Sequence, residues 1–216
     1  MLRWLLLALL FAALPGQAQD AKGANGVFLV ASPGLVDPNF RESVVLVTHM
    51  PDGGSIGFIV NRRGERSLAD ILPENETLKR YTEPLYLGGP VEASGLFAML
   101  RTRKAPPGAL QVLDEVAFAM EPAVLEQVLR APPGRVRFFN GYAGWAPGQL
   151  ASELARGGWR VVHADADTVF RSDMDTLWEE LIRRSRGLVA AAPDQLSAVS
   201  SDTPSRARRV SHGLGR

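Results

Sequence analysis

The sequence predicts a single α+β domain. Its first half contains runs of strand length that are rich in β-branched and aromatic residues and separated by Pro, Asp and Gly clusters, a pattern typical of antiparallel hairpins. Its second half contains one strand-helix-strand unit. About eight strands and four helices are expected, and they do not alternate regularly. This mixture favours an α+β fold over a doubly wound parallel sheet.

The first half is expected to begin with strands. A strand at 27–32 is followed by the loop SPGLVDPNF and by strands at 43–49 and 55–61. The turn MPDGGS between the last two contains residues that tolerate positive φ, so these strands are predicted to be antiparallel neighbours. Ser67 and Asp70 then have the spacing of a capping box, and the short helix that they begin should end before Pro73.

The second half is expected to alternate between hairpins and helices. Strands are predicted within 84–90, which ends in Gly-Gly-Pro, and at 96–101, 109–113, 116–120, 135–140 and 159–164. A helix begins at Glu121-Pro122, where proline suits the first position, and ends at Pro132. Another spans about 147–156, and Gly157-Gly158 closes it. The last helix, 174–187, is amphipathic.

The two ends of the chain predict export and disorder. Residues 1–18 have one arginine, an apolar stretch from Trp4 to Leu14 and small residues before Ala18, which is the layout of a cleaved signal peptide. Residues 19–186 form the domain, and the Ala, Ser and Pro-rich segment 187–216 is predicted to be disordered. We expect a periplasmic protein with no stable membrane span after cleavage. With no cysteine in the chain, it has no disulfides.

Charge gives no reason to expect a nucleic-acid partner. The chain has 24 Lys and Arg against 23 Asp and Glu, and removal of Arg3 with the signal peptide makes the totals equal. A neutral protein has no long-range field to attract nucleic acid or acidic lipid. The short basic clusters at 61–66, 101–104 and 206–209 are interpreted as solvated turns or tail.

The stretch FFNGYAGWAPGQL, residues 138–150, is the first candidate site. The spacing of its glycines at 141, 144 and 148 fits neither the dinucleotide fingerprint nor a Walker loop, which would need Lys followed by Ser or Thr. We therefore interpret it as a strand-to-helix corner. Its Tyr142 and Trp145 could offer a stacking surface to a small ligand or a peptide.

Catalytic chemistry is expected to be absent, and one alternative stays open. His163, Asp165 and Asp167 alternate along an extended segment and could converge on a divalent ion, although either aspartate could equally cap a helix. No nucleophile elbow and no cysteine are present. We expect no cofactor and no catalytic residue. The alternative is a hydrolase that uses acidic residues or a His/Asp metal site.

Four motifs in order resemble one bacterial family. FLVASPGLVDPNFRESVVLVTH, GSIGFIVNR, LYLGGPVEASGLF and GYAGWAPGQLASEL are similar to the YqgE/AlgH family over about 27–184. The resemblance implies a bifurcated, mainly antiparallel mixed sheet with a small barrel-like part and flanking helices. It implies no established activity, and it suggests a cytoplasmic location as the alternative to export. The chain departs from the family pattern at Arg63, Leu100 and Ala151.

The resemblance also selects candidate ligand-binding residues. We hypothesise a non-catalytic, exported binding or regulatory protein whose partner is a small polar, anionic or peptide ligand. The candidates are the residues that match the motifs and that carry polar side chains, aromatic rings or bare backbone amides: Asn61, Arg62, Gly88, Gly89, Pro90, Gly141, Tyr142, Trp145 and Gln149. The alternative to ligand binding is that the glycines serve tight turns and the aromatic residues fill the core.

Overall fold

A computed structural model describes residues 26–71 and 73–191 of the chain. The predicted signal peptide and the part of the predicted tail from 192 onward lie outside the described residues. The elements in order are β1 (Val27–Ala31), β2 (Val44–His49), β3 (Ser55–Ile59), β4 (Arg63–Ser67), α1 (Leu68–Ile71), β5 (Pro84–Leu87), β6 (Val91–Arg101), β7 (Leu110–Leu113), β8 (Val116–Ala119), α2 (Pro122–Val128), β9 (Val136–Trp145), α3 (Gln149–Ala155), β10 (Trp159–His163), α4 (Ala166–Val169) and α5 (Leu177–Ala191).

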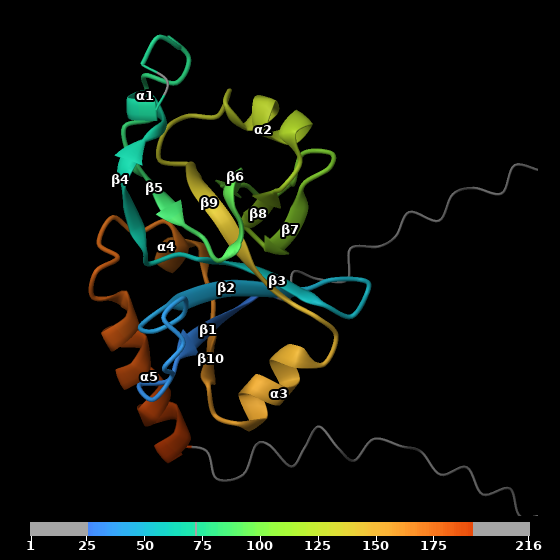
Figure 1. The fold of residues 1–216 in the computed structure, drawn as a ribbon, viewed down its shortest axis with the longest axis vertical. Helices are drawn as coiled ribbons and strands as arrows, with labels where there is room; N and C mark the ends of the chain where they lie inside the picture. The colour runs from blue at the N-terminus through green and yellow to red at the C-terminus, as the bar shows by residue number, and fades with distance from the viewer. Residues whose placement is uncertain (1–25, 72, 192–216) are drawn as a thin grey trace, which may run out of the picture.

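The strands form one branched and curled sheet (Figure 1). Its main path runs β10-β1-β2-β3-β9-β6-β8-β7, and β5 with β4 branches from β9. The pairings are antiparallel except for β5 with β9, which is parallel. The backbone N–H of Gly26 donates to the carbonyl of Val112 at 2.9 Å and so ties the start of β1 to β7. The predicted α+β class with a bifurcated, partly barrel-like sheet is confirmed.

Several local predictions are confirmed by the geometry. β2 and β3 pair as an antiparallel hairpin with His49 opposite Ser55. The capping box is formed: the N–H of Ser67 donates to Asp70 Oδ2 at 2.8 Å, and the N–H of Asp70 donates to Ser67 Oγ at 3.2 Å. Gly157 closes α3 with a φ of 75°, in the left-handed region that favours glycine.

Other local predictions were wrong in their boundaries. β9 continues to Trp145 instead of ending at Asn140, so the glycine stretch is largely strand and the corner is confined to 146–148. The segment 63–67 forms strand β4, which the charged sequence RGERS concealed. α5 begins at Leu177, and the side chain of Asp173 accepts hydrogen bonds just before it. The helix continues to Ala191, past residue 186.

The core lies on both faces of the sheet. The largest cluster fills the curl between the two halves and contains Phe28, Phe58, Phe118 and Phe139, all fully buried. A second cluster packs α2 on β6 and β8. The third lies where α3 and the loop after β1 cover the other face, with Trp145 and Trp159. Within 26–71 and 73–191, no helix has the length and apolar character needed to cross a membrane.

Candidate functional site

A groove of about 810 Å³ opens at one end of the sheet. It lies between the loop 32–40, the end of β9, the C-terminal end of α3 and the start of β10, with Pro90 at its edge. We call it the loop groove. Its volume lies within the range of sites for small molecules. The loop turns tightly at its far end, where Asp37 Oδ1 accepts from the N–H of Asn39 at 2.8 Å.

Three aromatic rings and one carboxylate form the floor of the loop groove. Phe40 stacks on Trp145 with centroids 6.0 Å apart and meets Trp159 edge-on at 5.4 Å. Both indole N–H groups donate to Glu153 Oε2, at 3.0 Å from Trp145 and 2.8 Å from Trp159. The tryptophans are only 5% and 4% exposed. One side chain on α3 therefore satisfies both buried indoles and fixes the ring positions.

Hydrogen bonding sets the protonation of that carboxylate. Burial by itself would raise the pKa of Glu153, but the hydrogen bonds from Trp159, Trp145 and Gln149 together with nearby Arg156 hold it below its ordinary value. Glu153 is therefore an anion whose oxygens already accept three hydrogen bonds from side chains.

Three of the predicted site residues line the loop groove. Pro90 lies there together with Trp145 and Gln149, although Pro90 comes from a different motif than the other two. The side chain of Gln149 bridges the corner after β9. Its Oε1 accepts from the N–H of Ala146 at 3.1 Å, and its Nε2 donates to Glu153 Oε1 at 3.1 Å.

Asn61 and Arg62 do not line the groove, and their side chains bind the end of its loop and the residues that follow it. Asn61 Oδ1 accepts from the N–H of Val44 at 2.7 Å, and its Nδ2 donates to the carbonyl of Glu42 at 2.9 Å. The guanidinium of Arg62 donates to the carbonyls of Asn39 and Arg41 at 2.7 and 3.0 Å. Arg62 therefore holds the end of the loop at Asn39, and both side chains fix the segment 41–44 that follows it.

The predicted glycines make a backbone crossing. A Cβ on Gly88 would lie 2.3 Å from the carbonyl oxygen of Gly141, and one on Gly141 would lie 2.4 Å from that of Gly89. A Cβ on Gly89 would lie 2.3 Å from Tyr142. Gly141 also has a φ of 66°. Close approach of two chain segments accounts for glycine at these positions.

Comparison with known proteins identifies the family to which this fold and sequence correspond. The profile of the AlgH-like family (DUF179) matches residues 28–190. The chain belongs to the AlgH-like family. A UPF0301 protein of Anaeromyxobacter dehalogenans is 37% identical over 178 residues, covering 77% of this chain and 90% of that protein. A UPF0301 protein of Streptomyces coelicolor is 35% identical, covering 82% and 96%. The solution structure of the AlgH protein from Pseudomonas aeruginosa aligns with a TM-score of 0.61 at 25% identity, covering 81% and 97%.

Tyr142 lies on the curled side of this AlgH-like sheet. Its half-buried ring meets Phe97 edge-on, with centroids 5.4 Å apart. Burial raises the pKa of the Tyr142 hydroxyl, and the nearby carboxylate of Glu92 raises it further. Tyr142 is not among the residues that line the loop groove. Tyr142 and Trp145, which were expected to form one stacking surface, therefore lie in different parts of the AlgH-like fold.

Sequence reasoning missed several residues of the groove. Phe40 and Trp159 complete its floor, and Arg156 and Arg160 are also among its lining residues. Glu153 could have been predicted as a neighbour of Gln149, because the two residues are four positions apart on one predicted helix and so share a face. The convergence of the loop with β10 depends on the pairing of β1 with β10, and the sequence gives no local sign of it.

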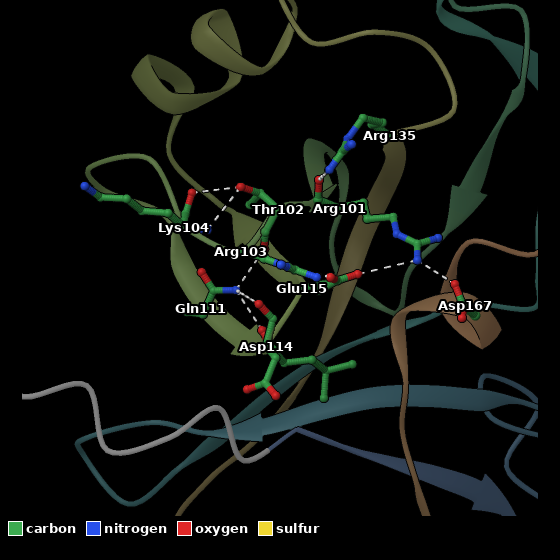
Figure 2. A network of polar contacts seen from close by, with 10 residues as sticks. Arg101, Thr102, Arg103, Lys104, Gln111, Asp114, Glu115, Arg135 and Asp167 are labelled. Carbon is green, nitrogen blue, oxygen red and sulfur yellow. Dashed lines mark hydrogen bonds and ion pairs between the residues drawn. The ribbon is translucent and has the colours of Figure 1, made fainter.

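Two members of the candidate metal trio, Asp165 and Asp167, have other contacts in this AlgH-like chain. Asp165 caps α4 and accepts from the N–H and hydroxyl of Thr168 at 2.7 and 2.8 Å. Asp167 pairs with Arg101 at 2.5 Å (Figure 2). His163 is exposed at the end of β10. Among the described residues, no group of three or more His, Cys, Asp and Glu side chains could hold a metal ion.

The basic cluster at 101–104 is largely engaged within the protein. Figure 2 shows Glu115 between Arg101 and Arg103, with distances of 3.5 and 2.7 Å, and Arg135 donating to the carbonyl of Arg101. These ion pairs join the end of β6 to the turn between β7 and β8 and to α4. The arginines consequently meet carboxylates of the same domain, which weakens the case for a phosphate-binding surface here.

Proposed function

We propose that this protein is an exported, non-catalytic binding protein whose ligand site is the loop groove. The observation that carries the binding proposal is the convergence of Pro90, Trp145 and Gln149, three residues from two motifs, on one groove of ligand size. The aromatic floor is fixed by Glu153 before any ligand arrives. Such preorganisation lowers the free-energy cost of ordering a site on binding.

The groove's carboxylates are poorly suited to hydrolysis. A two-carboxylate hydrolase needs one carboxyl with a raised pKa to act as general acid. The pKa of Glu153 is lowered instead, and its oxygens already accept three hydrogen bonds. The other carboxylate of the groove, Asp37, holds the loop turn through Asn39. Both acidic side chains therefore have structural roles that oppose the hydrolase alternative at this site.

Binding can be tested on the full chain by amide NMR. We expect at least one compound from a panel of cell-wall fragments, short peptides, N-acetylated amino acids and nucleotides to shift the signals of Gly34, Phe40, Gly144 and Gly157 together. The control signals are Gly134 and Leu129, which do not line the groove. Shifts confined to other surfaces would contradict the proposal. So would turnover of a simple ester or phosphoester that Glu153→Gln abolishes.

Export is supported by the first 18 residues and by the position of the family match. The match to the AlgH-like family begins at residue 28, so the segment with the layout of a signal peptide lies before it. In a Gram-negative host, we expect the protein in the periplasmic fraction with Gln19 as its first residue. Ala18→Phe should block processing, because the peptidase accepts small residues at that position, and Ala24→Phe is the control. A full-length chain in the cytoplasm would contradict export.

A further inference from the structure

One edge of the sheet is open within the described part of the chain. β10 ends the main strand path and pairs only with β1. Helices α5 and α3 contact β10 and lie on either side of it in Figure 1. They belong to the core clusters on the two faces of the sheet. The long side of β10 that faces away from β1 therefore has no described strand beside it.

The hydrogen-bond register shows which residues of β10 face this open edge. The N–H of Ser32 donates to the carbonyl of Gly158 at 2.9 Å, so the even-numbered residues of β10 bond with β1. In an antiparallel pair, alternate residues direct their N–H and C=O groups to opposite sides. The backbone groups of Trp159, Val161 and His163 consequently point away from β1. No hydrogen bond joins these groups to another described residue.

The edge of β10 lacks the features that usually prevent pairing. Sheet edges are commonly blocked by charged side chains, proline or a bulge. β10 contains no proline and pairs with β1 in an unbroken register. Its one arginine, Arg160, lies opposite Val30 and so on the face of the largest core cluster. By contrast, the edge strand β4 has the charged sequence RGERS, and β7 is tied to the chain at Gly26.

The outward side chain at the centre of β10 is apolar. Val161 is 52% exposed. It borders a hollow of about 380 Å³ that is lined mainly by aliphatic side chains of β1, β2 and α3, among them the half-buried Leu154 and the exposed Ala151. Covering such a surface removes apolar area from water, which favours association.

The strand is complementary to itself in the antiparallel direction. If a two-fold axis passes beside Val161, this residue lies opposite its own counterpart, and Trp159 lies opposite His163 of the other copy. All of these residues have outward-facing backbone groups, so each pair can exchange two hydrogen bonds. The two Val161 side chains would lie on the same face and contact each other. A register shifted by one residue would pair outward groups with inward ones and lose these bonds.

The charges at the two ends of β10 favour the same direction. Arg156 is exposed just before the strand, whereas Asp165 and Asp167 follow it. Asp165 is still extended, with φ −140° and ψ 156°, and the side chain of Asp167 is 86% exposed. Antiparallel pairing brings the basic end of one copy to the acidic end of the other. Parallel pairing would bring like charges together.

We infer that two copies of this chain associate through β10, in an antiparallel pairing centred on Val161 that joins their sheets. The partner is a second copy because the register, the apolar centre and the charged ends of the strand all match the strand itself. This inference does not depend on the ligand proposed for the loop groove.

Sedimentation velocity on the protein as purified from its host tests the association. We expect a dimer at about 100 μM that dissociates on dilution. Val161→Pro should weaken association at least tenfold, because proline removes an outward N–H and leaves the bonds to β1 intact. Val161→Lys, which keeps the backbone unchanged, should have the same effect. Val36→Lys is the matched control, since Val36 is 89% exposed on the loop after β1, and it should dimerise normally.

A single cysteine tests the register independently of these variants. The chain has no cysteine, so Val161→Cys introduces one thiol beside the two-fold axis. A short bis-maleimide should join two copies of this variant at least tenfold faster than two copies of Val36→Cys. A monomer at about 100 μM, or dimerisation of both Val161 variants like that of the wild type, would overturn the inference. Equal crosslinking of the two cysteine variants would overturn it as well.

Discussion

Arg137→Met should lower the free energy of unfolding by about 2–4 kcal/mol. Arg137 is 4% exposed on β9, and its guanidinium donates to the carbonyls of Val169 and Arg171. It also lies 4.9 Å from the ring centroid of Tyr86. Methionine matches the length of the side chain but leaves both carbonyls without these donors, and hydrogen bonds to charged groups contribute about 1.5–3 kcal/mol each.

The reason for this large effect is the place of Arg137 in the fold. Burial lowers the pKa of the guanidinium, but it stays protonated because arginine titrates far above neutrality. Its hydrogen bonds fasten the end of α4 and the chain leading to α5 onto the sheet. Removing the side chain should therefore loosen the segment 166–176 as well as lower overall stability.

Urea denaturation monitored by tryptophan fluorescence measures the change. Arg135→Met is the matched control, because Arg135 lies two positions earlier, is exposed and donates only to the carbonyl of Arg101. We expect it to change stability by less than about 1 kcal/mol. Equal losses in the two variants would show that the buried contacts of Arg137 contribute no special stability.

The sequence predicted those parts of the fold that depend on near neighbours in the chain. The hairpin of β2 and β3 follows from its turn chemistry, and the capping box of Ser67 and Asp70 follows from a three-residue spacing. The ordered motifs then led to the correct family and to a bifurcated sheet. In each case the signal lay within a short segment or in a set of segments recognised together.

Contacts between distant segments were beyond sequence reasoning. The extension of β9 through Gly141 depends on the crossing with Gly88 and Gly89, which only pairing with β5 and β6 creates. Strand β4 has a polar sequence and becomes a strand by pairing with β5. Likewise, the hydrogen bonds from Arg62 to the carbonyls of Asn39 and Arg41, and those of Asn61 with Val44 and Glu42, join segments about 20 positions apart and have no local sign in the sequence.

Glu153→Ala should lower the free energy of unfolding by about 2–4 kcal/mol at neutral pH. The variant leaves the indole N–H groups of Trp145 and Trp159 without their acceptor, and each buried unsatisfied donor is unfavourable by about 1–3 kcal/mol. Glu153→Gln keeps an acceptor oxygen of the same reach, so it should lower the free energy of unfolding by only about 1 kcal/mol. Ser152→Ala, at an exposed position next to it on α3, is the control.

The pH dependence of the same variants tests the role of the charge. Because the folded pKa of Glu153 lies below its ordinary value, its ionised form contributes stability above the unfolded pKa of about 4.3, and this contribution is lost as the pH falls through the folded pKa. Wild-type protein should therefore lose more stability than Glu153→Gln between pH 6 and the acid range, and the two curves should converge. Parallel curves from pH 7 to pH 3 would mean that the indoles need only an oxygen acceptor and that the negative charge of Glu153 adds nothing. In that case the groove floor would be held by hydrogen-bond geometry alone.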